Sequence, residues 1–207
     1  MTAQLALASG PCRFSLMTSP TFAAAARELE RVLATSANDL ASISESYASE
    51  PRAPGKWTRK EILGHLIDSA SNNHQRFVRG VQDGGGHYPG YDQSSCVEIQ
   101  RPNEVMWTLL LGLWRSYNDY LAHVIASLPA EAGGYAMQVG DDPQVDLLWI
   151  AVDYVEHLKH HLNQILGRRF ETTYPDTPFP HPAVAEGSVG SRAPGDLAAP
   201  IIAAGEV

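Results

Sequence analysis

Residues 58–83 read TRKEILGHLIDSASNNHQRFVRGVQD, and this stretch decides the fold. Thr58 and Glu61 have the spacing of a capping box, in which each side chain accepts a hydrogen bond from the other residue's backbone N–H group. Three consecutive glycines, residues 84–86, end the stretch. Between these signals the apolar residues recur at helical spacing: Ile62, Leu66, Ala70, Phe77 and Val81. The stretch therefore predicts one amphipathic helix from Thr58 to Asp83.

Three other segments show the same helical recurrence of apolar residues. They cover residues 20–48, 102–127 and 143–169. Ser19 followed by Pro20 gives the first of them a capping residue and a proline at the first helical position. No stretch alternates between apolar and polar residues strongly enough to predict a strand. Amphipathic helices bury their apolar faces against one another, so the sequence predicts an all-α fold, an up-down-type four-helix bundle.

The remaining segments divide the chain into a central domain and two irregular extensions. Residues 51–55 and 129–142 are rich in Pro or Gly and predict connections. Residues 87–101 predict a longer loop, and loops of this length often carry function. We expect a loose N-terminal lead-in over residues 1–19, the bundle over residues 20–169, and a Pro- and Gly-rich, partly ordered tail over residues 170–207.

The composition is typical of one globular domain. Of the 207 residues, 44% are hydrophobic and 18% are charged, a balance that supports a packed core. The formal net charge is −8 and Lys and Arg do not cluster, so we expect no nucleic-acid binding. The sequence has no long apolar run of the kind that spans a membrane. Cys12 and Cys96 form no disulfide framework and the N-terminus lacks a basic start, so we expect a cytoplasmic protein.

A polar stripe interrupts the amphipathic pattern of residues 58–83. It consists of residues at helical offsets of three, four, seven and eleven from the first: His65, Asp68, Ser69, Asn72 and Arg76. For an arbitrary helix such a stripe is more often a solvated face than a binding surface. His65, however, has Leu63, Leu66 and Ile67 as neighbours, which indicates at least partial burial.

The last helical segment carries a pair of histidines with metal-ligand spacing. His157 and His161 are four residues apart, so both imidazoles leave the same face of a helix and can share one ion. A pair at this spacing is also common on solvated faces. A third histidine from another helix, His65, would complete a nitrogen ligand set suited to Zn, Ni, Fe or Cu. Spacing alone does not show that His65 faces the other two.

Two motifs resemble those of a known family. The run Lys56-Trp57-Thr58 through Gly64-His65-Leu66-Ile67-Asp68-Ser69, followed by Arg76-Phe77, resembles the helix-two signature of the DinB/YfiT-like superfamily. The run YVEHLKHH, residues 154–161, resembles its H-x-x-x-H helix, and Tyr91-Asp92 resembles a loop element of its YfiT-type branch. The resemblance covers residues 20–168. It implies a four-helix bundle, often a homodimer, in which His65, His157 and His161 hold one divalent transition metal (Zn, Ni or Fe).

Four further residues are candidates for the surroundings of this site. Asp68 could orient a ligand imidazole, as carboxylates behind metal ligands do, or form a surface ion pair. Arg76 could meet an anionic substrate or pair with a carboxylate. Tyr91 and Asp92 could close over the metal from the long loop, or Asp92 could belong to a turn with Gly90.

Three hypotheses about function follow from the metal site. Because no glutamate accompanies the histidines as in H-E-x-x-H proteins, we favour a metal-dependent S-transferase that activates a low-molecular-weight thiol and acts on a small-molecule substrate. The resemblance implies S-transferases and also metal-dependent hydrolases, so a hydrolase that uses water is the alternative. The third hypothesis is a non-catalytic, metal-stabilised binding or stress-response module. An enzyme needs an open coordination position, whereas a structural site would have a fourth protein ligand such as Asp68 or Asp92.

Overall fold

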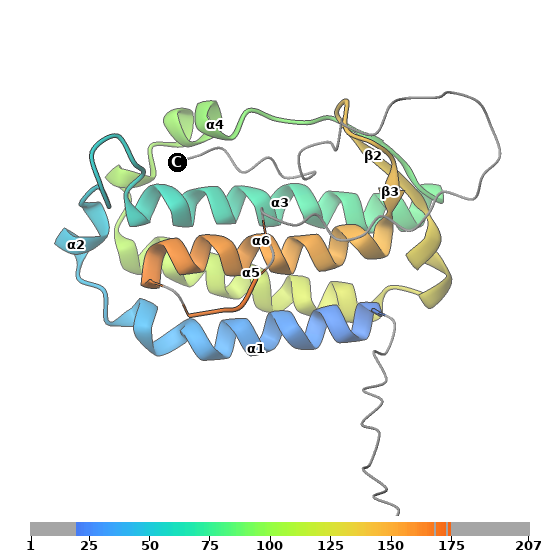
Figure 1. The fold of residues 1–207 in the computed structure, drawn as a ribbon, viewed down its shortest axis with the longest axis horizontal. Helices are drawn as coiled ribbons and strands as arrows, with labels where there is room; N and C mark the ends of the chain where they lie inside the picture. The colour runs from blue at the N-terminus through green and yellow to red at the C-terminus, as the bar shows by residue number, and fades with distance from the viewer. Residues whose placement is uncertain (1–19, 168, 173, 175–207) are drawn as a thin grey trace, which may run out of the picture.

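A computed structural model describes residues 20–167, 169–172 and 174 of the chain. The expectations for the lead-in over residues 1–19 and for most of the tail lie outside the described residues. Four long helices pack around one core, which confirms the predicted all-α four-helix bundle (Figure 1). The four helices are α1 (Phe22–Ala41), α3 (Arg59–Asp83), α5 (Trp107–Ser127) and α6 (Leu147–Leu166).

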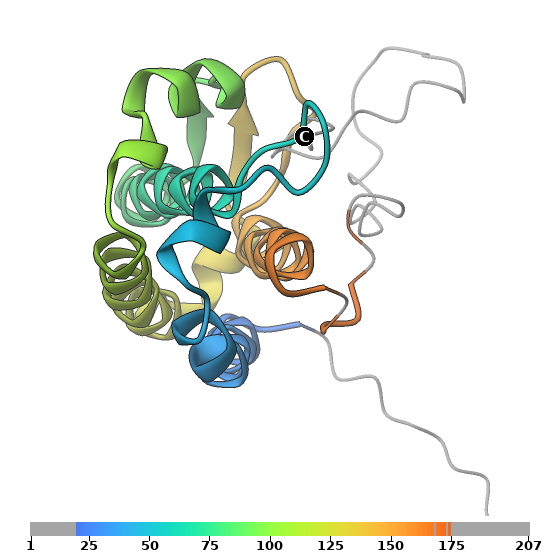
Figure 2. The same cartoon turned by 90° about the vertical axis from the view of Figure 1, so that its left-hand side faces the viewer.

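The four helices form a square in which each packs against two others. α1 and α3 both contact α5 and α6, as Figure 2 shows end-on. α3 and α5 run in the same direction, because Pro102, just before α5, packs at Gly64 near the start of α3. A crossover, residues 84–106, therefore has to return along the outside of the bundle. The sequence did not indicate this crossover.

The crossover is more regular than the loop predicted for residues 87–101. It contains β1 (Gly86–Tyr88), α4 (Gln93–Gln100) and a 3₁₀ turn, η1 (Pro102–Glu104). The Asp92 side chain caps α4 by accepting hydrogen bonds from the backbone N–H groups of Ser94 and Ser95. The prediction of an irregular loop was therefore wrong for most of this segment.

Helix boundaries also differ from the predicted ones. The segment predicted as one helix over residues 20–48 contains α1 and a separate short helix, α2 (Glu45–Ser49), because the Ser44 side chain caps a new turn by accepting from the backbone N–H of Tyr47. The prolines at 102 and 143 lie before the helices, so α5 and α6 begin later than predicted. The capping box of Thr58 and Glu61 is present as predicted at the start of α3.

A small three-stranded sheet closes one end of the bundle. β1 pairs in parallel with β2 (Ala136–Val139), and β2 pairs antiparallel with β3 (Val145–Asp146). A 3₁₀ turn, η2 (Ala130–Gly134), joins α5 to β2. Gly85 has a φ of 113°, and a Cβ there would lie 2.4 Å from the Ala136 carbonyl oxygen, so only glycine fits this entry to the sheet. Strands of two to four residues are too short to show alternation in the sequence.

The centre of the bundle is apolar and contains a few buried polar groups. Trp114 is fully buried there, and the indole N–H of Trp107 donates to the Leu40 carbonyl at 3.0 Å. The buried Tyr154 hydroxyl donates to the Asn118 side-chain oxygen. In the part of the chain that the structure describes, no helix is long and apolar enough to cross a membrane. The contact between α3 and α6 differs from this apolar centre, because polar side chains of both helices are buried in it.

Candidate metal centre

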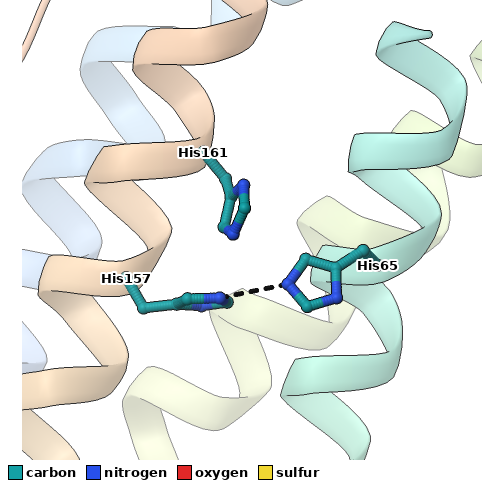
Figure 3. A group of neighbouring side chains, drawn as sticks. All are labelled: His65, His157 and His161. Carbon is teal, nitrogen blue, oxygen red and sulfur yellow. Dashed lines mark hydrogen bonds between the residues drawn. The ribbon is translucent and has the colours of Figure 1, made fainter. Parts of the chain in front are cut away.

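The antiparallel packing of α3 against α6 brings three histidines together. His65 lies in the second turn of α3, while His157 and His161 lie one turn apart on the facing side of α6. Figure 3 shows the two imidazoles of α6 directed toward that of α3. All three residues are at most 1% exposed. The polar stripe of residues 58–83 is therefore not a solvated face at His65, nor at Ser69 and Arg76, which are also buried.

The distances between the imidazole nitrogens suit a shared ion. The Nε2 atoms of His65 and His157 are 3.0 Å apart, and one ligand atom from each of the three histidines lies within 4.8 Å of the others. Metal–nitrogen bonds of about 2.0–2.1 Å place two ligands of a tetrahedral ion about 3.3 Å apart.

Burial keeps the three imidazoles neutral. It lowers the pKa of His65 to about 4. The pKa of His157 is well below its ordinary value, first because of burial and then because of the neighbouring His161 and His65. Burial, followed by the neighbouring His65, likewise depresses the pKa of His161. Neutral imidazoles have a free lone pair at neutral pH, which is the form that binds a metal.

The hydrogen bonds at the site leave imidazole nitrogens unsatisfied. His161 donates from Nδ1 to the Gln164 side-chain oxygen at 2.8 Å, so its Nε2 has the lone pair. Within the described residues, this Nε2 and the Nδ1 atoms of His65 and His157 are buried without a hydrogen-bond partner. An unsatisfied buried polar atom costs about 1–3 kcal/mol. A metal ion would satisfy the His161 atom and fits these residues.

Gln164 connects a fourth histidine to the site. Its side-chain amide donates to Nε2 of the half-buried His160 at 3.0 Å while its oxygen accepts from His161. His160 thus supports His161 indirectly and offers no ligand to the three-histidine group. Sequence reasoning assigned Gln164 no role, although its position three residues after His161 places it on the same face of the helix.

The structure places Asp68 and Asp92 beside the site and not on it. Asp68 is half-buried, and its Oδ2 atom is buried without a hydrogen-bond partner among the described residues. Burial raises the pKa of Asp68, and the nearby side chains of Gln100 and Cys96 on α4 oppose that rise. Asp92 is exposed and caps α4, as described above. Among the described residues, no carboxylate or thiol joins the three histidines as a fourth ligand.

Arg76 of α3 and Tyr91 lie close enough for their charges to interact. Arg76 is 2% exposed and donates to the Asn73 side-chain oxygen at 3.3 Å. Burial lowers its pKa, while Tyr91 and the carboxylates of Asp153 and Asp142 oppose that shift. Burial raises the pKa of the Tyr91 hydroxyl, and the Arg76 guanidinium opposes this rise.

Asp153 and two aromatic residues were not identified from the sequence. Asp153 lies one turn before His157 on α6, and burial raises its pKa to about 8, with Glu156 adding to the rise and Arg76 opposing it. Trp57 and Tyr174 place their rings 5.6 Å from His65 and 5.4 Å from His157, respectively. The spacing of four residues between Asp153 and His157 could have indicated that Asp153 lies on the same helix face as the histidines. Nothing in the sequence indicated the contacts of Trp57 and Tyr174.

Comparisons with known proteins agree on the fold. The family model described as the DinB superfamily matches residues 28–165 of the chain. Among solved structures, the chain is similar to YfiT from Bacillus subtilis, with a TM-score of 0.61 and 20% sequence identity over 76% of this chain and 89% of that chain. YfiT is described as a probable metal-dependent hydrolase with an unusual four-helix bundle topology. No curated protein sequence matches the chain significantly.

Proposed function

The chain belongs to the DinB superfamily, and from this premise we propose that it is a metal-dependent enzyme that transfers a low-molecular-weight thiol to a small-molecule substrate. The observation that carries the proposal is the buried group of three neutral imidazoles, His65, His157 and His161. These imidazoles would hold one Zn, Ni or Fe ion, with the Gln164 side chain fixing the orientation of His161.

The lack of a fourth protein ligand among the described residues supports catalysis over a purely structural role. Three protein ligands and at least one exchangeable position are typical of catalytic metal sites, whereas structural zinc sites have four protein ligands. When bound, a divalent ion here supplies positive charge that lowers the pKa of a thiol or a water molecule at its open position.

The protonation of Asp153 favours a thiol over water as the nucleophile. A water molecule that attacks a substrate benefits from a base that accepts its proton. In the metal-free protein, burial raises the pKa of Asp153 to about 8, so this carboxyl is a poor base at neutral pH. In the proposed reaction the thiol releases its proton to solvent, its sulfur forms a bond to an electrophilic carbon, and the leaving group of that carbon departs with the electron pair of the broken bond.

A hydrolase is the second candidate, because the structurally similar YfiT is described as a probable metal-dependent hydrolase. In that case, the Asp153 carboxylate would act as the base that accepts the proton of the attacking water above pH 8, where it ionises. A hydrolase of this kind would therefore be more active at alkaline pH.

Activity assays on protein loaded with Zn²⁺, Ni²⁺ or Fe²⁺ separate the candidates. For transfer, glutathione or free cysteine is offered with monochlorobimane as the electrophile. For hydrolysis, 4-nitrophenyl acetate is offered without a thiol. We expect thiol conjugation that requires both the metal and His157. Metal-dependent ester hydrolysis without conjugation would replace the transferase by the hydrolase, and metal binding without either reaction would support the non-catalytic module.

We also propose that the protein forms a homodimer through α5. Large apolar side chains lie exposed on one side of this helix, at spacings close to those of a helix–helix contact: Met106, Leu109, Leu113 and Tyr120. Each is more than 50% exposed, and a row of this kind is more typical of an interface than of a solvated surface.

Light scattering during gel filtration tests this interface. The wild type is expected to have twice the chain mass of 22.5 kDa. Leu109→Glu combined with Leu113→Glu should reduce it to one chain mass, because two carboxylates would be buried in the contact. Val78→Glu, which changes an exposed apolar residue on α3, should leave the dimer intact. A monomeric wild type would refute the interface.

A further inference from the structure

A chain of two hydrogen bonds on α6 runs from His160 through Gln164 to the metal centre. The side-chain N–H of Gln164 donates to Nε2 of His160 at 3.0 Å, and its oxygen accepts from Nδ1 of His161 at 2.8 Å. Gln164 follows His160 by four residues and His161 by three, so one amide on the helix reaches both imidazoles. The three-histidine group does not include His160, so any contribution of His160 to the site passes through Gln164.

The amide of Gln164 fits between the two imidazoles in two orientations. Its oxygen and nitrogen ends have nearly the same shape, so a half-turn of the amide group fills the same space. After that half-turn, the oxygen would accept from an N–H of His160 and the nitrogen would donate to Nδ1 of His161. Each orientation makes two hydrogen bonds, so the number of bonds does not decide between them.

Only one of these orientations suits a metal, because a neutral imidazole has one N–H and one lone pair. In the orientation that the structure has, the proton of His161 is on Nδ1 and the lone pair is on Nε2, which is buried without a hydrogen-bond partner among the described residues. Figure 3 shows one ring nitrogen of His161 directed toward the bond between His65 and His157. The opposite orientation would move the proton to Nε2 and remove the lone pair that a metal needs.

His160 is placed so that its own lone pair selects the amide orientation. It is half-buried, and its ring centre lies 5.0 Å from that of His161, at an interplanar angle of 82°, and 5.3 Å from that of Tyr174. The Nε2 of His160 has no proton when it accepts from the amide N–H. Such an acceptor excludes the oxygen end of the amide, because two lone pairs repel each other. The nitrogen end therefore faces His160, and the oxygen end is left for His161.

We propose that His160 is a positioning residue of the metal centre, which holds the proton of His161 on Nδ1 and its lone pair on Nε2 through the Gln164 amide. His65 and His157 lack this support, because their Nε2 atoms bond with each other at 3.0 Å and their Nδ1 atoms are buried without a partner among the described residues. In that bond one of the two imidazoles has its proton on Nε2. The lone pair of His161 is thus the one that is fixed in advance. The proposal rests on the metal site of the proposed function but not on its thiol chemistry.

Nuclear magnetic resonance of the metal-free protein with ¹⁵N-labelled histidine tests the position of this proton. Protonated and unprotonated ring nitrogens give separate signals at neutral pH, and those of His161 are identified by their loss in His161→Asn. We expect the wild type to have the His161 proton on Nδ1. His160→Leu and Gln164→Leu should each give a mixture of the two N–H forms of His161. Gln75→Leu, which removes the same amide from an exposed position on α3, should keep the wild-type form.

The affinity for Zn²⁺, measured by competition with a chromogenic chelator, is the second readout. Gln164→Leu should weaken it about tenfold or more, the usual effect of losing the group that orients a ligand histidine. His160→Leu should weaken it about fivefold, the effect of losing one neutral hydrogen bond. Gln75→Leu should leave the affinity unchanged.

His160→Glu separates the positioning role from a merely structural one. A carboxylate can only accept hydrogen bonds, so this variant should restore the Nδ1 proton of His161 that His160→Leu loses. A wild-type His161 with its proton on Nε2, or wild-type behaviour of both leucine variants at positions 160 and 164, would overturn the proposal. Should His160→Leu not fold, loss of the Nδ1 proton in His160→Glu overturns it. The proton is located without metal or substrate, so a failure of the proposed enzyme activity does not alter this result.

Discussion

Replacing His157 with alanine is expected to lower the metal content of the protein from about one ion per chain to less than about a tenth of that. His157 is fully buried and its Nε2 lies 3.0 Å from that of His65, so no other described side chain can take its position. The content is measured by elemental mass spectrometry on protein purified without an affinity tag. In the wild type, metal at a hundred times its dissociation constant should add about 2.7 kcal/mol to the free energy of unfolding.

His123→Ala is the matched control for this experiment. His123 lies exposed on α5 and takes no part in the three-histidine group, so its loss should leave the metal content unchanged. Circular dichroism should show the same helical content for both variants. A wild-type protein that cannot be loaded, or a His157→Ala protein that keeps its metal, would rule out the shared site.

Replacing Asp153 with asparagine is expected to stabilise the protein at neutral pH. The pKa of this carboxyl is raised from 3.8 to about 8 in the folded state. The folded protein therefore retains a proton that the unfolded chain releases, and stability is lost as the pH rises from about 4 to about 8. The loss approaches about 1.4 kcal/mol for each pH unit in that window. Asparagine does not titrate, so the stabilisation by Asp153→Asn should grow with pH.

Urea unfolding between pH 4.5 and 8.5 measures this difference. Asp83→Asn, which removes an exposed carboxyl from the end of α3, should show a much smaller dependence on pH. A constant difference between Asp153→Asn and the wild type across the range would mean that Asp153 is already ionised beside Arg76. The proposed preference for a thiol over water would then lose its support.

The four main helices could be predicted because their signals are local. The capping box at Thr58 and the helical spacing of apolar residues act within a few turns of the chain, and α3 begins and ends where these signals place it. The break between α1 and α2 was missed because the apolar spacing continues past Ser44. The sheet was missed because β1 and β2 stabilise each other from distant parts of the sequence.

The candidate site was only partly predictable for a similar reason. The spacing of His157 and His161 defines a pair on one helix, but the position of His65 depends on the direction in which α3 and α6 pack. The polar stripe on α3 was ambiguous because its burial depends on α6, which presents the buried Asp153 and His157 to it. The family resemblance, and not the spacing of the histidines in the sequence, predicted that His65, His157 and His161 form one site.

The crossover between α3 and α5 packs on the outside of the bundle and carries none of the three histidines. It contributes Val97 and Pro102 to the buried interior, and its helix α4 packs against α3. The histidines themselves belong to two helices of the bundle. Substitutions at the exposed positions between Pro89 and Gln100 can therefore change the surface next to α3 while the buried contacts of the bundle stay intact.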